Sequence, residues 1–420
     1  MSKYYKRIMD DVLNEELEAF GAVLITGPKW CGKTTTAKQI AKSVLYMQQP
    51  DEKQNNLQLA QVQPSLLLNG EKPRLIDEWQ MAPQLWDAIR FDVDQKSTEG
   101  LYILTGSTVV DESKISHSGA GRISRLTMRT MSLFESKDSN GAVSLGDLFK
   151  GEDNIGAQSD LGLTDIADLV VRGGWPNTIN KSKKTVMKQI AGYCNTIANS
   201  DIGEVDGIKR DEGKTLAILR SFSRHIATQA SMTTILKDIK ANNETMDIDT
   251  LSDYLKALEK LFVVEDLTAW SPLLRSKTAI RTSNTRHFTD PAIAAKMLNA
   301  SPKDLILDLN TFGFLFESLV VRDLRIYAQS LEGRVFHYRD KTGLEADAII
   351  HLDNGDWGAI EVKLGQNKID EGAENLLKLE KKIDTDKMSK PTFLAVITGT
   401  KYAYKREDGV LVIPIGCLRP

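Results

Sequence analysis

The sequence has few of the residues that build disulfide-rich, zinc-binding or membrane-spanning proteins. Its three cysteines, Cys31, Cys194 and Cys417, lie far apart and show no paired metal-ligand spacing, which argues against a disulfide framework or a zinc knuckle. No apolar run approaches the roughly 20 residues that span a bilayer, and residues 1–21 lack the apolar core of a signal peptide. We therefore expect a protein without a membrane partner, located in a reducing cytoplasm.

A strong charge of one sign is also lacking. The formal net charge is −3, so the chain as a whole does not attract nucleic acid, and any polyanion-binding surface must be local. Hydrophobic residues make up 41% and charged residues 26% of the chain, which is typical of a globular protein. With 420 residues the chain is longer than one hydrophobic core supports, so we expect about two to four domains.

The first informative stretch is GPKWCGKTTTA at residues 27–37. The apolar run AVLIT before it, residues 22–26, has the length of a strand, and KTTTAKQIAKSVL, residues 33–45, has helical spacing. The residues expected on one face of that helix are Ala37, Ile40, Ala41 and Val44. The stretch is therefore predicted to be a loop that joins a strand to a helix.

This loop has the full spacing of a phosphate loop in the strand-to-helix context that gives the pattern its meaning. Glycines let successive backbone N–H groups point at phosphate oxygens, and the helix N-terminus adds partial positive charge. Lys33 is expected to neutralise the β- and γ-phosphates, and the Thr34 hydroxyl to ligate Mg²⁺. The alternative is a tight turn with an incidental Lys-Thr pair. The expected nucleotide-binding residues are Gly27, Pro28, Lys29, Trp30, Cys31, Gly32, Lys33, Thr34 and Thr35.

Two acids follow the apolar residues of RLIDEWQ, residues 74–80. Asp77 is expected to hold Mg²⁺ through water, and Glu78 to polarise the water that attacks the phosphate. An ordinary exposed strand end is the alternative. GLYILTGST, residues 100–108, predicts another strand. In a parallel sheet its end lies beside Asp77, so Ser107 or its neighbour Thr108 would sense the γ-phosphate unless the segment is a simple Ser/Thr loop.

Three arginines, Arg122, Arg125 and Arg129, follow a Gly-Ala-Gly segment. The planar charge of arginine suits a finger that stabilises a transferring phosphate, and we expect Arg122 to serve in this way. The sequence leaves open whether it acts in its own chain or across a homo-oligomer. A structural ion pair is the alternative.

Together, GPKWCGKTTTA, LIDEWQ, LTGST and the GR that precedes MSLFE resemble the AAA-type domain of archaeal and bacterial ATPases with a C-terminal domain of uncharacterised function. The motifs stand in the family's order and cover roughly the first third of the chain. The resemblance implies a parallel P-loop sheet, ATP and Mg²⁺ as cofactors, and ATP hydrolysis. Two departures are LYMQQPDEK, where family members often have an acidic pair, and the presence of Trp30 and Cys31 in the loop. We further expect modification of the Cys31 thiol to block nucleotide binding.

The middle of the chain reads as a connection followed by helices. Residues 137–165 are rich in Gly, Ser, Asp and Asn, which indicates a loop excursion. VRGGWP, residues 171–176, resembles the turn that follows the ATPase core in this family. Residues 231–270 then show a helix, a turn, a second helix and a strand, which is a winged-helix order.

The charges of this winged-helix region point in two directions. The second helix begins among acids, which would repel phosphates; these acids are Asp247, Asp249 and Asp253. Residues 271–288 hold only basic charged residues, Arg275, Lys277, Arg281 and Arg286. They form either a wing that contacts a nucleic-acid backbone or a surface that docks within the chain.

The last third predicts a long helix over residues 304–328 followed by three strands, RVFHYRD, LEADAIIHL and DWGAIEVKLG. Residues two apart in a strand share a face, so Glu361 and Lys363 project together, and Asp347 lies beside them across the hairpin. A closing helix, EGAENLLKLEKKI, and the strands PTFLAVITG and GVLVIPI complete the domain.

This cluster resembles the PD-(D/E)xK nuclease fold. The resemblance implies that Asp347 and Glu361 are metal ligands, that Lys363 orients water and that Glu317 is an auxiliary acid on the first helix. Two carboxylates would hold Mg²⁺ against a phosphodiester of DNA. The alternative is an exposed strand with alternating charge, and such folds also persist as binding modules.

We therefore expect an α/β protein of four parts. These are residues 1–150, a P-loop AAA-type ATPase domain; 151–230, a helical lid or linker; 231–300, a winged-helix-like domain; and 301–420, a restriction-endonuclease-like domain. In one hypothesis, ATP hydrolysis controls a DNA-directed nuclease-like tail. In the other, ATP binding gates a switch that docks DNA or a protein without cleavage. A small-molecule kinase is a third hypothesis, but its substrate-sized lid is missing.

Overall fold

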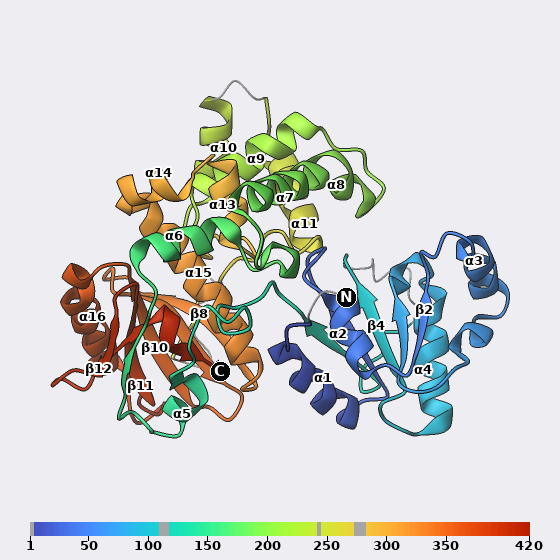
Figure 1. The fold of residues 1–420 in the computed structure, drawn as a ribbon, viewed down its shortest axis with the longest axis horizontal. Coiled ribbons are helices and arrows are strands. Elements are labelled where there is room, and N and C mark those ends of the chain that lie inside the picture. The colour runs from blue at the N-terminus through green and yellow to red at the C-terminus, as the bar shows by residue number, and fades with distance from the viewer. Residues whose placement is uncertain (1–3, 109–116, 242–244, 273–282) are drawn as a thin grey trace. The chain divides into compact units, whose positions relative to one another are not determined.

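The computed structural model describes residues 4–108, 117–241, 245–272 and 283–420 (Figure 1). The chain divides into two compact units. The first unit comprises Met1–Thr130, Asp201–Lys209 and Ala257–Val263, and the second unit comprises Met131–Ser200, Arg210–Lys256 and Val264–Pro420. Within the described ranges, every helix is too short or too polar to cross a membrane.

The first unit contains a five-stranded sheet in the order β2-β3-β4-β1-β5, in which every pairing is parallel. Its strands are β1 (Ala22–Thr26), β2 (Ser43–Tyr46), β3 (Arg74–Asp77), β4 (Tyr102–Gly106) and β5 (Ile123–Thr127). Its longer helices are α1 (Ile8–Ala19), α2 (Lys33–Ile40), α3 (Lys53–Val62) and α4 (Gln84–Lys96). Because the strands are parallel, all of their carboxyl ends meet at one edge of the sheet.

Strand β1 shows why these residues form a buried parallel strand. Ala22 and Leu24 pack into a core cluster with α4, whereas Val23 and Ile25 pack into a second cluster with α1 and α2. Apolar side chains on both faces are the pattern of a strand covered by helices on each side. The predicted strands at β1, β3 and β4 are confirmed.

The helix after the loop is shorter than predicted. Helix α2 ends at Ile40, and Val44 lies in strand β2, where it is paired with Leu75 of β3. The helical spacing that included Val44 was therefore wrong at its end. The β-branched and aromatic residues of Ser43–Tyr46 gain a paired place in the sheet, and this long-range pairing overrides the local periodicity.

The second unit combines helices with a seven-stranded sheet. Its helices are α5 (Leu145–Phe149), α6 (Leu163–Arg172), α7 (Lys183–Thr196), α9 (Glu212–Arg224), α10 (Met232–Ala241), α11 (Ile248–Lys260), α13 (Pro291–Met297), α14 (Pro302–Leu307), α15 (Leu309–Gln329) and α16 (Ile369–Lys382). The last residues of α11 belong to the first unit. The strands of the sheet are β7 (Gly156–Gln158), β8 (Gly333–Arg339), β9 (Glu345–Leu352), β10 (Trp357–Lys363), β11 (Phe393–Thr398), β12 (Tyr402–Lys405) and β13 (Leu411–Pro414).

The sheet of the second unit has the order β7-β12-β13-β11-β10-β9-β8. Strands β8, β9 and β10 are antiparallel, whereas β10, β11 and β13 are parallel. Helix α16 packs its buried residues on this sheet around Trp357. The predicted order of helix, three strands, helix and two strands is confirmed. The sequence missed β12 and β7, because short strands at the margin of a sheet have little apolar periodicity of their own.

The compact units differ from the predicted domain boundaries. Residues 131–150 were expected in the ATPase domain but belong to the second unit. Met131 N donates a 2.7 Å hydrogen bond to Gly174 O. A two-residue strand, β6 (Val143–Ser144), pairs with β14 (Leu418–Arg419) at the end of the chain. Pairings of this kind connect distant parts of the chain and leave no local pattern.

In the middle region the two helices predicted for a winged helix are present as α10 and α11. The predicted strand over residues 262–270 is reduced to isolated bridges, Val264 with Phe288, Leu267 with Thr285 and Ala269 with His337. Arg275, Lys277 and Arg281 lie outside the described residues. Arg286 is described, and its guanidinium contacts the Asp266 carboxylate. Its charge is therefore already paired within the chain.

Candidate functional site

The predicted phosphate loop leaves the carboxyl end of β1 and enters α2 through backbone angles that require glycine. Gly27 has a φ of 146°, and a Cβ there would lie 2.0 Å from Met128 O. Gly32, the N-cap of α2, is left-handed with a φ of 106°. Glycine adopts these angles without a steric cost. Trp30 between them has a φ of 69° although it carries a side chain, and it is 57% exposed.

Lys33 is turned into this loop. Its Nζ donates hydrogen bonds to Gly27 O at 2.8 Å and to Pro28 O at 2.9 Å, and the residue is buried. The ammonium is thus held at the mouth of the loop that would surround a phosphate group. A positive charge beside a glycine-lined backbone cradle fits a nucleotide polyphosphate.

The predicted Mg²⁺ ligands lie together at the carboxyl edge of the sheet. Thr34 Oγ1 donates a hydrogen bond of 2.6 Å to Asp77 Oδ1. Thr105 Oγ1, on the neighbouring strand β4, donates to the same oxygen at 2.6 Å, because β3 and β4 are in register with Asp77 opposite Thr105. A hydroxyl and a carboxylate oxygen are hard ligands of the kind Mg²⁺ takes.

Glu78 and Ser107 are also neighbours. Glu78 lies just beyond β3 in a left-handed conformation, with a φ of 56°. Its Oε2 accepts a 3.1 Å hydrogen bond from Ser107 Oγ and a hydrogen bond from Gln80 Nε2. The structure therefore brings the expected base and the expected sensor into contact. Gln80 was missed, although it stands two residues after Glu78.

The expected role of Arg122 toward its own chain is wrong. Arg122 precedes β5, and its carbonyl oxygen accepts a 3.0 Å hydrogen bond from the backbone N–H of Ala22, the first residue of β1. Its Nε lies 2.7 Å from Asp94 Oδ1 on α4. The phosphate loop lies at the other end of β1, roughly 15 Å away at the rise of a strand. Only an action across subunits remains a prediction.

Arg7, a residue that the sequence did not single out, holds the loop in place. Arg7, at the start of α1, is buried. Its guanidinium donates to Cys31 O at 2.8 Å and to Arg129 O at 2.9 Å. Arg7 thus ties the loop to the chain that follows β5. Arg129, unlike Arg122, lies at the carboxyl edge of the sheet. No motif marks Arg7, because its partners are distant in the sequence.

A second unpredicted contact involves a residue of the loop itself. Lys29 Nζ lies 2.7 Å from Asp201 Oδ1 and 3.7 Å from Glu204 Oε2. Asp201 ends a turn of π-helix, Ile197–Asp201, and its side chain is only 6% exposed. The segment Asp201–Lys209 belongs to the first unit, so a distant part of the chain neutralises a cation of the phosphate loop.

The burial of the Cys31 thiol disfavours the modification that was expected to block nucleotide binding, and the effect of such a modification stays a prediction. Cys31 is fully buried, and its Sγ donates a 3.5 Å hydrogen bond to Met128 O. A reagent in solution cannot reach such a group. Cys31 serves in the core under the loop, where it packs with Val23 and Ile25.

The predicted acid–lysine cluster of the second unit also assembles. Lys363 Nζ contacts Glu361 Oε2 and lies 3.6 Å from Asp347 Oδ2. The other contact of Asp347 Oδ2 is a 2.7 Å hydrogen bond from Val362 N. Antiparallel pairing of β9 with β10 places these side chains together, as the spacing of the two strands predicted.

Burial dominates the electrostatics of this cluster. Burial, assisted by Asp347, raises the pKa of Glu361 to about 8. Burial lowers the pKa of Lys363, but the carboxylates of Asp347 and Glu361 outweigh it, and the net pKa is raised. Glu317 on α15 is affected in the same direction as Glu361, since burial raises its pKa well above the usual range. Burial thus disfavours the ionised form of both glutamates, and the charge of the Lys363 ammonium offsets part of this effect.

Glu317 and Asp347 line one cavity of about 280 Å³, together with His337 and Glu345. In the ranges that the structure describes, no three His, Cys, Asp or Glu side chains are arranged to hold a metal ion. The predicted metal ligands, Asp347 and Glu361, are a pair of acids that both contact Lys363. Two carboxylates are a donor set that fits a hard cation, provided that both are ionised.

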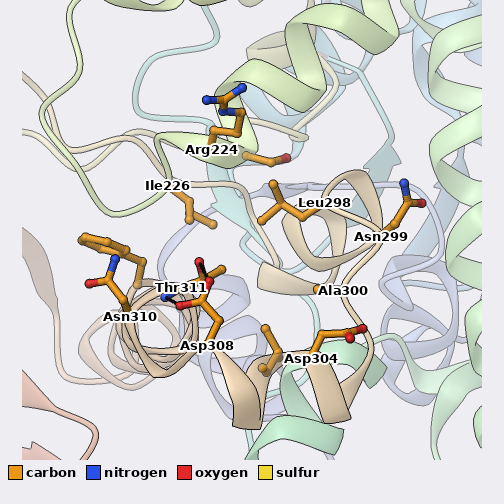
Figure 2. Close-up of a pocket in the computed structure, with 12 residues that line it drawn as sticks. Arg224, Ile226, Leu298, Asn299, Ala300, Asp304, Asp308, Asn310 and Thr311 are labelled. Carbon is orange, nitrogen blue, oxygen red and sulfur yellow. Dashed lines mark hydrogen bonds between the residues drawn. The ribbon is translucent and has the colours of Figure 1, made fainter.

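A larger cavity of about 450 Å³ lies among α9, α13, α14 and α15 (Figure 2). Its one cationic residue, Arg224, is paired with Asp238 at 3.1 Å. Asp308 caps α15 by accepting hydrogen bonds from Thr311, as Figure 2 shows. Asp304, in the first turn of α14, accepts hydrogen bonds from N and Oγ of the N-cap Ser301. Because these polar groups already serve the helices, nothing in this cavity converges on a ligand.

Comparison with known families agrees with the geometry of the first unit. Residues 19–137 match the AAA domain family. Residues 163–304 and 312–418 match two domains of unknown function, DUF8612 and DUF4143. The part of the chain that matches the AAA domain family contains the parallel sheet and the predicted phosphate loop. It is followed by a helical middle region and a C-terminal sheet domain. The matched families describe no activity for the second unit.

Two relatives match most of the chain. They are the uncharacterized proteins Mb2031c of Mycobacterium bovis and Rv2008c of Mycobacterium tuberculosis, each 23% identical over 362 residues, or 84% of this chain and 72% of the relative. Among solved structures, the chain is similar to the Walker-type ATPase PABY2304 of Pyrococcus abyssi, with 14% identity, 70% of this chain and 96% of that chain covered, and a TM-score of 0.42. The Hef helicase domain of Pyrococcus furiosus has 12% identity, coverages of 96% and 90%, and a TM-score of 0.22. TM-scores below 0.5 establish no common fold.

Proposed function

We propose that the protein is a Mg²⁺-dependent ATP hydrolase whose site is the loop of residues 27–32 with Lys33, Thr34 and Asp77. The observation that carries the proposal is the 2.6 Å hydrogen bond from Thr34 to Asp77 directly beside the lysine of the loop. When bound, Mg²⁺ supplies positive charge that offsets the charge of the phosphates. The match of this region to the AAA domain family supports the proposal.

The residues of the chain have distinct roles in this proposal. The loop N–H groups and Lys33 bind the phosphates, and Thr34 and Asp77 hold the cation. Glu78, oriented by its hydrogen bonds with Ser107 and Gln80, positions the attacking water. Arg122 of the same chain has no role in this proposal, because its guanidinium pairs with Asp94.

Substitution of Lys33 tests the assignment. Lys33→Ala should lower ATP turnover by about 100-fold or more, because a charge aimed at the reacting phosphate is removed. Lys53→Ala, an exposed lysine on α3 of the same unit, is the matched control and should keep full turnover. Phosphate release measured at saturating ATP distinguishes the variants. Full turnover in folded Lys33→Ala would refute the proposal.

A second activity, cleavage of a DNA phosphodiester, is favoured by the convergence of Asp347, Glu361 and Lys363. Asp347 and Glu361 would hold the cation, and Lys363 would orient water. Plasmid and branched DNA with Mg²⁺ or Mn²⁺ test this proposal. Cleavage should be lost in Asp347→Asn and in Glu361→Gln, and retained in Glu374→Gln, an exposed acid on α16. Cleavage that survives both cluster substitutions would refute it.

In this proposal, nucleotide binding at the first unit controls the second unit. It permits the second unit either to cleave DNA or to dock DNA or a protein without cleavage. Mass in solution with and without ATP and Mg²⁺ tests for a homo-oligomer, which a trans-acting Arg122 requires. If ATP does not change the rate of DNA cleavage by the wild-type protein, the hypothesis that ATP controls a nuclease is refuted. If ATP does not change DNA binding, the hypothesis of an ATP-gated switch is refuted.

A further inference from the structure

A groove of about 410 Å³ in the second unit lies outside both sites described above. Three segments line it, residues 161–163, 364–366 and 399–402, together with Ile369 and Tyr404. Its volume is within the range of roughly 300–1,000 Å³ that is common for ligand sites. The segments follow or precede β10, β11, β12 and α6, so regular elements hold the walls of the groove.

Two tyrosines form one wall. Tyr402 and Tyr404 are in strand β12, where they are 61% and 39% exposed, while Ala403 between them is buried. Side chains two apart in a strand share a face and stand roughly 6–7 Å from each other. Two large aromatic side chains therefore stand in sequence along one edge of the groove. Their exposed ring surface is available to a flat ligand in the groove.

The charge of the groove has one sign. Lys401 is the charged residue among those that line it, and the lining includes no acid. Lys401 is exposed and has no ion-pair partner within the described parts of the chain. The two cations that follow Tyr404 in the chain, in contrast, are already paired: Lys405 with Asp153 and Arg406 with Asp370. A negatively charged group that enters the groove would therefore meet Lys401.

Open backbone borders the same place. A Cβ on Gly365 would meet no atom within 4 Å, so the chain is uncovered at that point. At Gly399 the two loops approach so closely that a Cβ would lie 2.8 Å from Leu364 O. The groove thus combines flat aromatic surface, accessible main chain and Lys401, which is without an ion-pair partner among the described residues.

We propose that this groove binds a single-stranded nucleic acid, with bases stacked on Tyr402 and Tyr404 and a phosphate at Lys401. Every base has a flat face that stacks on an aromatic ring, and this mode of binding tolerates any sequence. The spacing of roughly 6–7 Å along the strand between Tyr402 and Tyr404 is longer than the step of about 3.4 Å along a duplex strand, so two bases that stack on these tyrosines are unstacked from each other. A duplex does not present its bases in this way. A peptide offers no row of planar groups with one negative charge for each.

The proposal requires neither ATP hydrolysis nor phosphodiester cleavage. Leu364, in the groove, follows Lys363 of the acid–lysine cluster directly, but no residue of that cluster lines the groove. Failure of the nuclease assignment would therefore leave this binding site intact. Loss of binding in the groove variants would equally leave the nucleotide site intact.

Binding of a fluorescein-labelled 20-nucleotide oligo-dT by the full-length protein tests the proposal, with fluorescence anisotropy at 50 mM salt. Tyr402→Ala and Tyr404→Ala should each weaken binding by between about 5-fold and 150-fold, because one stacked base is lost. Tyr402→Phe and Tyr404→Phe should bind like the wild type, since the ring remains. Phe91→Ala, an exposed aromatic residue on α4, is the matched control and should also bind like the wild type.

Salt dependence and cross-linking give independent outcomes. Lys401→Ala should reduce the slope of log affinity against log salt by about 0.7, the value for one phosphate of a single strand. An oligonucleotide with 5-iodouracil should cross-link to Tyr402 or Tyr404 of the unaltered protein, which does not depend on the folding of a variant. Three results would each overturn the proposal. They are no binding of the oligonucleotide at 50 mM salt, equal affinity of both alanine variants and the wild type, and cross-links only to residues other than Tyr402 and Tyr404. Equal affinity for a duplex with the same dependence on the tyrosines would overturn the single-strand assignment.

Discussion

The hydroxyl of Thr34 lies 2.6 Å from Asp77 Oδ1, so the first turn of α2 and the end of β3 meet at the carboxyl edge of the sheet. Asp77→Asn keeps the size of the side chain but removes its charge. We expect ATP turnover at fixed Mg²⁺ to fall about 10- to 100-fold and to recover in part at higher Mg²⁺. Phosphate release across a Mg²⁺ titration measures both effects.

The control for Asp77 is Asp51→Asn, an exposed acid of the first unit. It should have the wild-type dependence on Mg²⁺. If Asp77→Asn also kept the wild-type Mg²⁺ dependence, the carboxylate would have no part in holding the cation.

Gly27→Ala should disrupt the phosphate loop. The φ of 146° is unfavourable for any side chain, and the added Cβ would lie 2.0 Å from a backbone oxygen. We expect the free energy of unfolding of the first unit to fall by more than about 1 kcal/mol, and the affinity for a fluorescent ATP analogue to be lost. Gly192→Ala in α7, where a Cβ meets open space, should leave that affinity unchanged and stabilise its helix by about 0.5–1 kcal/mol. Tight ATP binding by Gly27→Ala would contradict the structure of the loop.

The contact of Lys29 with Asp201 should contribute to stability. Lys29→Ala leaves a buried carboxylate without this partner, so we expect a loss of about 1.5–3 kcal/mol. Urea unfolding of Lys29→Ala, Asp201→Asn and the double variant measures the coupling between the two side chains. Lys6→Ala is the control, because the pair of Lys6 with Asp11 is exposed and should contribute about 1 kcal/mol or less. Additive effects of the two single substitutions would show that the residues are not coupled.

Acid should destabilise the second unit through its buried histidines. Burial lowers the pKa of His337 to about 4, and that of His287 well below its usual value. Between about pH 6.5 and 4, the unfolded chain binds a proton that folded His337 does not, so stability falls as the pH falls. One such group accounts for on the order of 3 kcal/mol over this range.

Urea unfolding at pH 7.5 and pH 5 tests this dependence. In His337→Gln the difference between the two pH values should shrink by the share of His337. The share of His287, which is at least as large because its pKa is lowered well below its usual value, should remain. His117→Gln, an exposed histidine, should leave the difference unchanged. An undiminished difference in His337→Gln would show that another group carries the acid sensitivity.

The sequence predicted those features whose causes are local. Glycines, a lysine and a threonine at fixed spacing between an apolar run and a helical pattern define the loop, because its geometry is set by neighbouring residues. The pairing of Asp347 with Glu361 and Lys363 followed from the two-residue period of strands and the antiparallel hairpin. These predictions required only one or two adjacent elements.

Features that depend on which strand ends meet came only from the tertiary structure. The order of the motifs suggested that Arg122 shares a site with the phosphate loop. Arg122 instead stands at the amino edge of the parallel sheet, where it pairs with Asp94. Lys29 pairs with Asp201 across more than a hundred intervening residues. Local periodicity also extended α2 beyond Ile40, because a pattern cannot show that the next residues gain more by pairing with β3. Burial, partner choice and strand order are properties of the packed chain, and they decided which of the predicted residues share a site.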